Sequence, residues 1–339
     1  MTTLAALATK DALVLGCDSL GSVTKWMLDP FTLVGEFFDP KEGFKLKVDK
    51  DGTPLLKKFD DVYNKSELIP YYHMTHVSKL FSLEPLGMGV MATGIASIGS
   101  RTIKSLIREF KVSEKVFTKE GMDSIDYTVD SIAQTLLKYI VEYYEAEYSE
   151  WASKPELEIM IGGYDKTKHV PDIYRIFVNN NKIEQIFPGK APFGIAFGGQ
   201  MDEIQRIVFG TDWRNKINLK DRVNKLLNKY QNLLQDYLKG KEIYEELPKI
   251  DNFEEELSLF KDWDLIHFDV NWGDFSNQNA IECVSWFVGI MIKSHQFRSQ
   301  LPMVGGEVHL GLITKDKGFT FISKEEYIHE GHGTLMEGL

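Results

Sequence analysis

The sequence predicts an α+β fold in which two antiparallel sheets are flanked by helices. Short apolar segments of strand character occur first as two pairs and later as a longer run, and two amphipathic helices separate the pairs from this run. A further helix and a final hairpin follow. Paired strands separated by paired helices are typical of antiparallel sheets that carry helices on their outer faces.

The first pair of strands is predicted at 4–9 and 13–17, around a turn at 10–12. Both strands are apolar on both faces, so we expect the sheet that they begin to be covered on both sides. The second pair is predicted at 77–83 and 87–93.

Two helical stripes follow the second pair of strands. The first consists of Ile103, Leu106, Ile107 and Phe110, and the second of Ile125, Val129, Ile132, Leu136, Ile140 and Tyr143. Steps of three and four residues indicate one helix face that packs on a core.

The second half of the chain continues with strands and one clear helix. Strands are expected at 158–162, 172–178, 183–187 and 193–197, with a turn at 179–181. Ser276 is expected to cap a helix that runs through Met291. A hairpin at 308–313 and 319–322, turned at 315–318, follows it.

The 339 residues are interpreted as a single domain, 1–339, with two insertions at 26–72 and 210–275. The first insertion is rich in proline and is expected to hold one hairpin. The stretch 203–260 is charged and helical, with an apolar stripe that indicates an insertion or a partner-facing helix. This stripe consists of Val223, Leu226, Tyr230, Leu233 and Tyr237. Without both insertions, the chain has the length of one large domain.

Composition excludes several classes of protein. The formal net charge is −11 and no basic cluster stands out, so nucleic acid is not expected as a partner. The longest apolar run, 286–292, is too short to span a membrane, and no secretory signal is visible. Two cysteines in apolar contexts fit a reducing compartment. We therefore expect a cytoplasmic protein without a membrane partner.

Four short motifs do not carry the chemistry that they suggest. Residues 94–101 lack the lysine of a phosphate-binding loop, and the glycines are better explained by a helix that begins after a strand. The glycines of 87–92 precede or lie within a strand rather than open a helix. The histidines of 329–332 have the wrong spacing for a zinc helix, and His73 and His76 have few carboxylates nearby. No metal or cofactor is therefore expected.

The informative segment is Met1-Thr2-Thr3. An initiator methionine is normally removed before a small residue, which makes Thr2 the mature N-terminus. A free N-terminal threonine carries a nucleophilic hydroxyl and a basic α-amine in one residue. Because the ordinary pKa of an α-amine is ~7.7–8.0, a useful fraction is unprotonated near neutral pH.

Three further residues give this threonine a context. The predicted hairpin returns Asp18 to the neighbourhood of Thr2. Lys79 is a lone charge at the start of an apolar strand, and a buried lysine needs an anionic partner, for which Asp18 is the candidate. The strand that ends at 93 delivers Gly94 to a helix N-terminus, where its amide can face an oxyanion.

In these motifs, the sequence resembles the proteasome β-type family of N-terminal-nucleophile hydrolases. The matching positions are Thr2-Thr3, Lys10-Asp11, Leu15-Gly16-Cys17-Asp18-Ser19, Val77-Ser78-Lys79-Leu80-Phe81 and Ala92-Thr93-Gly94, and more loosely 161–165 and 308–314. The resemblance covers most of the chain outside the two insertions. It implies a four-layer αββα sandwich and a threonine peptidase that uses no cofactor.

The resemblance also implies a role for each matching position. Thr2 would attack the peptide carbonyl and form an acyl-enzyme, and its own amine would take the proton. Lys79 would lower the pKa of both groups, Asp18 would orient Lys79, and the Gly94 amide would stabilise the oxyanion. Ala92 and Ala96 stand where the family lines its substrate pocket. The implied partners are a peptide or unfolded-protein substrate, further copies of the chain in a homo-oligomeric ring, and an ATPase unfoldase.

The sequence also departs from the family pattern. A Gly-Ser-Gly turn of the family appears as Gly198-Gly199-Gln200, and the Asp and Ser that support the N-terminal amine appear as Leu301 and Val304. Two alternatives therefore stay open. One is an N-terminal-nucleophile amidase that acts on a small amide, because a fold and a nucleophile do not set the substrate. The other is a non-catalytic ring subunit.

Overall fold

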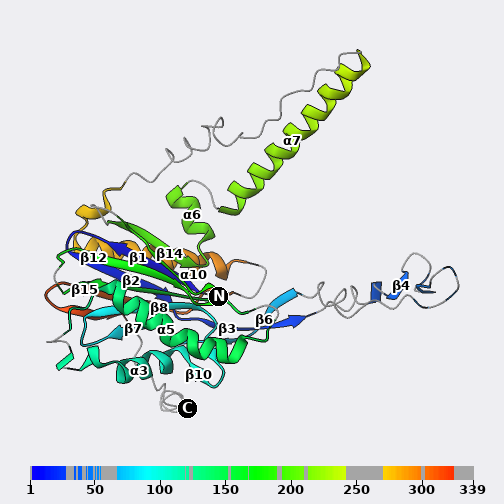
Figure 1. Cartoon of the computed structure of the whole chain (residues 1–339). Helices are drawn as coiled ribbons and strands as arrows, with labels where there is room; N and C mark the ends of the chain where they lie inside the picture. Colours follow the sequence, from blue (N-terminus) through cyan, green and yellow to red (C-terminus); the bar gives the residue numbers. More distant parts are fainter. Residues whose placement is uncertain are drawn as a thin grey trace, which may run out of the picture.

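Two five-stranded antiparallel sheets form the centre of the computed structural model (Figure 1). The first has the order β14-β1-β2-β15-β16 and the second the order β13-β12-β11-β8-β7. The strands of the first sheet are β1 (Thr3–Ala8), β2 (Ala12–Asp18), β14 (Gly194–Gly199), β15 (Val308–Thr314) and β16 (Gly318–Ser323). Those of the second are β7 (Leu80–Leu83), β8 (Met88–Gly94), β11 (Leu157–Tyr164), β12 (Pro171–Phe177) and β13 (Lys182–Gln185).

The structure describes most of the chain outside the two predicted insertions. The described residues are 2–27, 34–35, 37–39, 43, 45–48, 50, 52, 54, 67–118, 120–121, 125–151, 154–166, 168–188, 193–209, 213–241, 270–298 and 302–323. The end of the stretch 203–260 lies outside them, as do the histidines of 329–332 and Leu301.

Helices and smaller strand pairs surround the two sheets. The helices are α3 (Ile103–Ser113), α5 (Val129–Tyr148), α6 (Asp202–Phe209), α7 (Trp213–Gly240) and α10 (Asn277–Gln296). The small antiparallel pairs are β3 (Gly21–Met27) with β6 (Glu67–Met74), β4 (Phe38–Asp39) with β5 (Lys45–Leu46), and β9 (Ser97–Ile98) with β10 (Arg101–Thr102). Single 3-10 turns lie at Lys115–Phe117, Val178–Asn180 and Trp272–Asp274.

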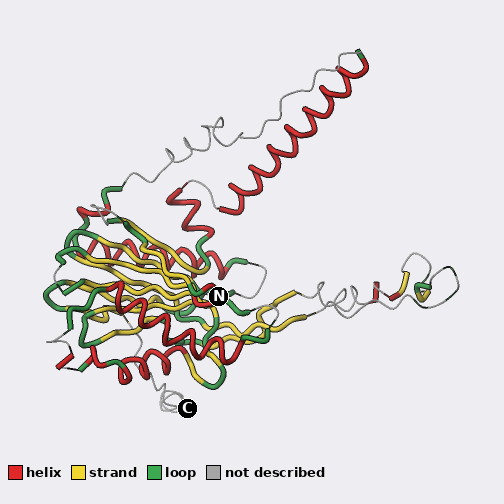
Figure 2. Tube along the Cα trace, viewed as in Figure 1, coloured by secondary structure: helices red, strands yellow, loops and turns green. Residues whose placement is uncertain are grey.

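Three hydrophobic clusters hold these elements together. The first joins the second sheet to α3 and α5, and includes Phe110, Leu136 and Ile159. The second lies between the sheets, where Leu4 and Leu15 meet Met91 and Met160. The third joins the first sheet to α6 and α10. Figure 2 shows the same arrangement, with helices on the outer side of each sheet. The predicted α+β class, with antiparallel sheets and helices, is confirmed.

The β1–β2 hairpin follows directly from its sequence. The Thr9 hydroxyl accepts hydrogen bonds from the amides of Asp11 and Ala12 at 3.2 and 3.0 Å, and the Thr9 amide donates to the Ala12 carbonyl at 2.8 Å. A side chain that satisfies turn amides in this way fixes the register of the strands. Both strands are buried along their whole length, as their apolar faces predict.

Most predicted helix features are present. The four residues of the first stripe are the buried residues of α3, and Ser276 caps α10 by accepting from the Asn279 amide at 3.2 Å. The predicted membership of Ile125 in the second helix is wrong, because Ile125 is 39 % exposed and α5 begins at Val129. Thr128 and Ser131 form a capping box there, which sets the start of the helix more strongly than the apolar spacing does.

Within the predicted insertions, the described residues include the short hairpin β4–β5, most of β6 and the 3-10 turn Trp272–Asp274. They also include the long helix α7, which projects away from the sheets in Figure 1. The single-domain interpretation with insertions at 26–72 and 210–275 stays a prediction. None of the described helices is long and apolar enough to cross a bilayer.

Candidate active site

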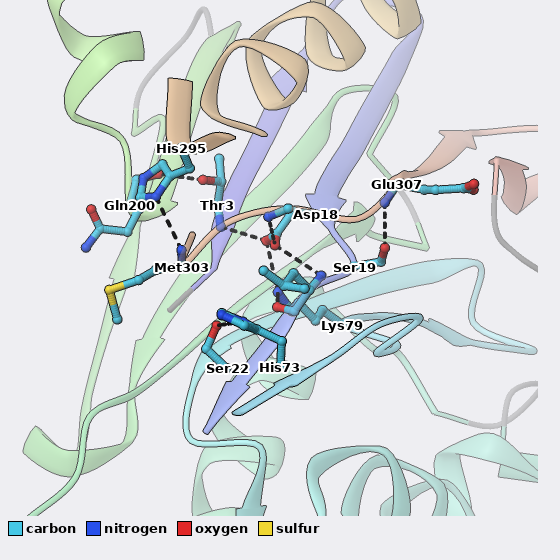
Figure 3. Close-up of polar contacts among 12 residues, drawn as sticks. Thr3, Asp18, Ser19, Ser22, His73, Lys79, Gln200, His295, Met303 and Glu307 are labelled. Atoms are coloured by element: carbon cyan, nitrogen blue, oxygen red, sulfur yellow. Dashed lines mark hydrogen bonds and ion pairs between the residues drawn. The ribbon is translucent and has the colours of Figure 1, made fainter. Parts of the chain in front are cut away.

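The hairpin brings the N-terminal residues against the end of β2. Leu4 pairs with Cys17, so the next position outward places Thr3 beside Asp18. The Thr3 amide donates to Asp18 Oδ1 at 2.9 Å, and the Thr3 hydroxyl donates to the Gln200 carbonyl at 2.8 Å (Figure 3). Thr2 is 4 % exposed and precedes β1 directly. The hairpin therefore brings Asp18 against Thr3, the residue that follows Thr2.

Asp18 is fully buried and its carboxylate accepts four hydrogen bonds. Oδ1 accepts from the Thr3 amide and from Lys79 Nζ, each at 2.9 Å. Oδ2 accepts from the Leu20 amide at 3.3 Å and from the Gly305 amide at 3.1 Å. A buried carboxylate is tolerated only when its charge is paired and its lone pairs are satisfied, and this one meets both conditions.

Lys79 is the partner that the sequence predicts for Asp18. It is 6 % exposed and lies one residue before β7. Its ammonium donates to Asp18 and to the Leu20 carbonyl, at 2.6 Å in the second case. Its own carbonyl accepts from the Ala92 amide at 3.0 Å, which ties it to the neighbouring strand β8. Among the described residues, these bonds use two of the three ammonium protons.

Gly199 closes the site against Thr2. The Thr2 carbonyl accepts from the Gln200 amide at 2.8 Å. Gly199 has φ +67°, and a Cβ there would lie 1.9 Å from the Thr2 carbonyl oxygen and 2.9 Å from Thr93 Oγ1. Thr2 and Thr93 thus approach the same point, and only glycine fits between them.

Gly94 lies at the end of β8, immediately after Thr93. Its φ is +106°, and a Cβ there would lie 2.1 Å from the Glu156 carbonyl oxygen. The prediction that Gly94 begins a helix is wrong: the β9–β10 hairpin follows β8, and α3 begins only at Ile103. The hairpin intervenes because the Ile103 amide donates to the Ala96 carbonyl at 3.0 Å and closes the loop.

The two predicted pocket residues lie in different surroundings. Ala92 is buried in the first cluster, on the helix side of the second sheet. Ala96 is exposed in the loop before β9.

A charged pair that the sequence reading missed lies beside Gly199. Glu158 of β11 pairs across the strands with Thr93, and its Oε1 lies 3.1 Å from Arg175 Nε. Arg175 also donates to the Phe197 carbonyl. Burial raises the pKa of Glu158, while Arg175 and a hydrogen bond from the Gly199 amide lower it. The sequence does carry a feature that could have indicated this pair. Glu158, like Lys79, is a lone charge near the start of an apolar strand.

The segment before β15 supports Asp18 through its backbone rather than its side chains. Val304 is fully buried in the third cluster, and Leu301 lies outside the described residues. The Gly305 amide binds Asp18, and the Gly305 carbonyl accepts from the amides of Ser19 and Leu20 at 3.2 and 2.9 Å. Backbone contacts of this kind leave no side-chain signature in a sequence.

The discounted motifs have ordinary structural roles where they are described. The glycines of 87–92 lie just before and within β8, and His73 Nδ1 lies 3.2 Å from Ser22 Oγ. A search of the described residues finds no group of three or more His, Cys, Asp or Glu side chains that could hold a metal ion.

Comparisons with known proteins add only a coarse likeness. No protein-family model and no curated protein matches the chain. Solved structures similar to it include an Anbu (Gly-1) mutant from Hyphomicrobium sp. strain MC1, which is 10% identical over 99% of this chain and 91% of that chain, with a TM-score of 0.45. The helical assembly of the Anbu complex from Pseudomonas aeruginosa is 11% identical over 98% and 90%, with a TM-score of 0.47. Anbu (ancestral beta-subunit) from Yersinia bercovieri is 10% identical over 99% and 90%, with a TM-score of 0.43.

These findings correct the family assignment. The sequence motifs resemble the proteasome β-type threonine peptidases, but the similar structures are Anbu proteins, a distinct family, and identity to them is low. The resemblance failed because it rests on a few short motifs around one hairpin and one lysine.

Proposed function

We propose that this chain is a hydrolase that cleaves peptide bonds with Thr2 as an N-terminal nucleophile, exposed by removal of Met1. One observation carries the proposal. The amide of Thr3 and the ammonium of Lys79 bind the same oxygen of Asp18, each at 2.9 Å. This shared oxygen holds a buried positive charge close to the backbone of Thr3, the residue that follows Thr2. A structural role alone does not require that charge.

The chemistry follows from these groups. Thr2 Oγ1 attacks the carbonyl carbon, and its proton passes to the α-amine of the same residue, directly or through a water. The tetrahedral intermediate collapses as the C–N bond breaks, and the leaving amine takes the proton from the α-ammonium. Water then hydrolyses the ester, again with the α-amine as base. The positive charge of Lys79 favours the deprotonated hydroxyl and amine.

Oxyanion stabilisation is assigned to the Gly94 amide in this proposal. Support comes from Thr93 and Gly199, which bring the end of β8 against Thr2. One well-placed amide donor contributes ~2.7–4 kcal/mol to such a transition state. Ala92 and Ala96 remain the proposed pocket residues.

The wider architecture is part of the same proposal. The three hydrophobic clusters support a four-layer αββα sandwich formed by a single domain with two insertions. We propose a homo-oligomeric assembly, since a helical assembly is described for the Anbu complex of Pseudomonas aeruginosa. A cytoplasmic location fits a chain with two cysteines. A ring and an ATPase partner stay as expectations for the native protein.

Intact-mass measurement with an N-terminal-threonine-directed β-lactone tests the proposal. We expect loss of Met1 and a single adduct on Thr2 in the wild type. Thr2→Ala should show no adduct and no hydrolysis of fluorogenic peptides, whereas Thr2→Ser, which keeps the hydroxyl, should retain both. Lys79→Ala should abolish hydrolysis while gel filtration shows unchanged assembly. A retained Met1, or an unmodified Thr2, would instead support a non-catalytic subunit.

A further inference from the structure

A buried histidine of α10 lies against the segment that holds Asp18. His295 is 2 % exposed and lies in the last turn of α10. Its Nδ1 accepts a hydrogen bond from the Met303 amide at 3.4 Å (Figure 3). Its Nε2 is buried and has no hydrogen-bond partner among the described residues.

This geometry defines the charge state of the ring. An imidazole nitrogen accepts a hydrogen bond only when it carries no proton, so His295 is the neutral tautomer with its proton on Nε2. The charged groups that face it are Asp202 and Glu203 of α6, Arg298 after α10, and Asp18 of β2. Burial and Arg298 lower the pKa of His295, and the three carboxylates oppose them without reversing the shift.

Met303, which contacts His295, precedes by two residues the glycine that binds Asp18, Gly305. Val304 is fully buried in the third cluster, which anchors the segment between Met303 and Gly305. The Gly305 amide then donates to Asp18 Oδ2, and the Gly305 carbonyl accepts from two amides that follow Asp18. A change at Met303 is therefore transmitted to one of the four hydrogen bonds of the Asp18 carboxylate.

We propose that His295 is a positioning residue for the Asp18–Lys79 pair, that it acts by holding the Met303–Gly305 segment, and that its protonation releases this segment. The proposal rests on the proposed function, since it assigns His295 a role in the reactivity of Thr2. A protonated ring donates from both nitrogens, so Nδ1 can no longer accept from Met303. Asp18 Oδ2 then loses its fixed Gly305 donor, so the carboxylate that accepts from Lys79 is held less firmly.

Hydrogen exchange tests the contact without any activity. We expect peptides that cover 302–307, corrected for intrinsic exchange, to lose protection in the wild type as the pH falls from 7.5 to 5. His295→Asn keeps an acceptor at the position of Nδ1 that does not titrate, so its protection should show no such step. His295→Phe removes the acceptor and should show low protection throughout. Equal protection of the wild type and His295→Phe at every pH would overturn the proposal.

The rate of β-lactone modification of Thr2 tests the functional role. At pH 7.5, His295→Phe should react at least about tenfold more slowly, the scale expected for a small misplacement of a reacting group. His295→Asn should react within about threefold of the wild type and should lack the wild-type loss of rate at acidic pH. The exposed His169→Gln serves as the control and should keep the wild-type profile.

The outcomes separate the two proposals. If the wild type reacts and His295→Phe shares its rate and pH profile, the role of His295 is overturned and the proposed function stands. If wild-type Thr2 does not react at any pH, the proposed function fails together with the role of His295 in reactivity. The exchange experiment still decides in that case whether the ring holds the Met303–Gly305 segment.

Discussion

At the scale of single residues, the site depends on a buried carboxylate that binds four donors. Asp18 pairs with Lys79 and accepts three backbone amides, so its removal leaves a buried ammonium without a counter-charge. Breaking a buried pair from one side costs ~3–5 kcal/mol. We therefore expect Asp18→Asn to lower the free energy of unfolding by about that amount in urea titrations. The exposed Asp11→Asn should change it by less than ~0.5 kcal/mol, and equal losses in the two variants would contradict the argument.

Gly199 offers a second test at this scale. Alanine there would place its Cβ 1.9 Å from the Thr2 carbonyl oxygen at a φ of +67°, so Thr2 must move. We expect Gly199→Ala to cost at least ~1–3 kcal/mol of stability and to suppress β-lactone modification of Thr2. Gly289, in α10, has open space around its Cβ position. Gly289→Ala should therefore gain ~0.5–1 kcal/mol by chemical denaturation, and a stable, reactive Gly199→Ala would refute the steric account.

At the scale of elements, α7 differs from the other described helices in the exposure of its apolar side chains. Leu226, Tyr230, Leu233 and Tyr237 are each 59–67 % exposed, while Leu136 of α5 is fully buried. Truncation of an exposed side chain removes few contacts, so Leu226→Ala should change the free energy of unfolding by less than ~0.5 kcal/mol. Leu136→Ala should cost ~2–5 kcal/mol. A loss above ~1.5 kcal/mol in Leu226→Ala would show that this face is covered in solution.

The elements also show which parts of the molecule a sequence can predict. The β1–β2 hairpin was predictable from its two apolar strands. The Asp18–Lys79 pair was also predictable, because a lone charge in an apolar strand requires a partner and few carboxylates are candidates for it. The Gly94 helix was a wrong prediction, since a short hairpin and a strand-to-helix turn both use closely spaced glycines. The support of Asp18 by Gly305 was not predictable. It depends on a backbone amide 287 residues away, and every residue type except proline carries one.

At the scale of the whole molecule, the buried His295 and the partly buried Glu158 give stability opposite dependences on pH. The pKa of His295 is lowered from its ordinary value of 6.5, so below that value the unfolded chain binds more protons and stability is lost as the pH falls. The pKa of Glu158 is raised from 4.5, so the folded chain holds its proton longer and stability is lost as the pH rises through the raised value. Between pH 4.5 and 6.5 the two effects oppose each other.

Urea unfolding of the two variants tests this balance. The free energy of unfolding of His295→Gln should decline more with rising pH than that of the wild type. The free energy of unfolding of Glu158→Gln should rise more steeply with pH than that of the wild type. The His169→Gln control should follow the wild-type curve, and parallel curves for all four proteins would contradict the pKa shifts of both groups.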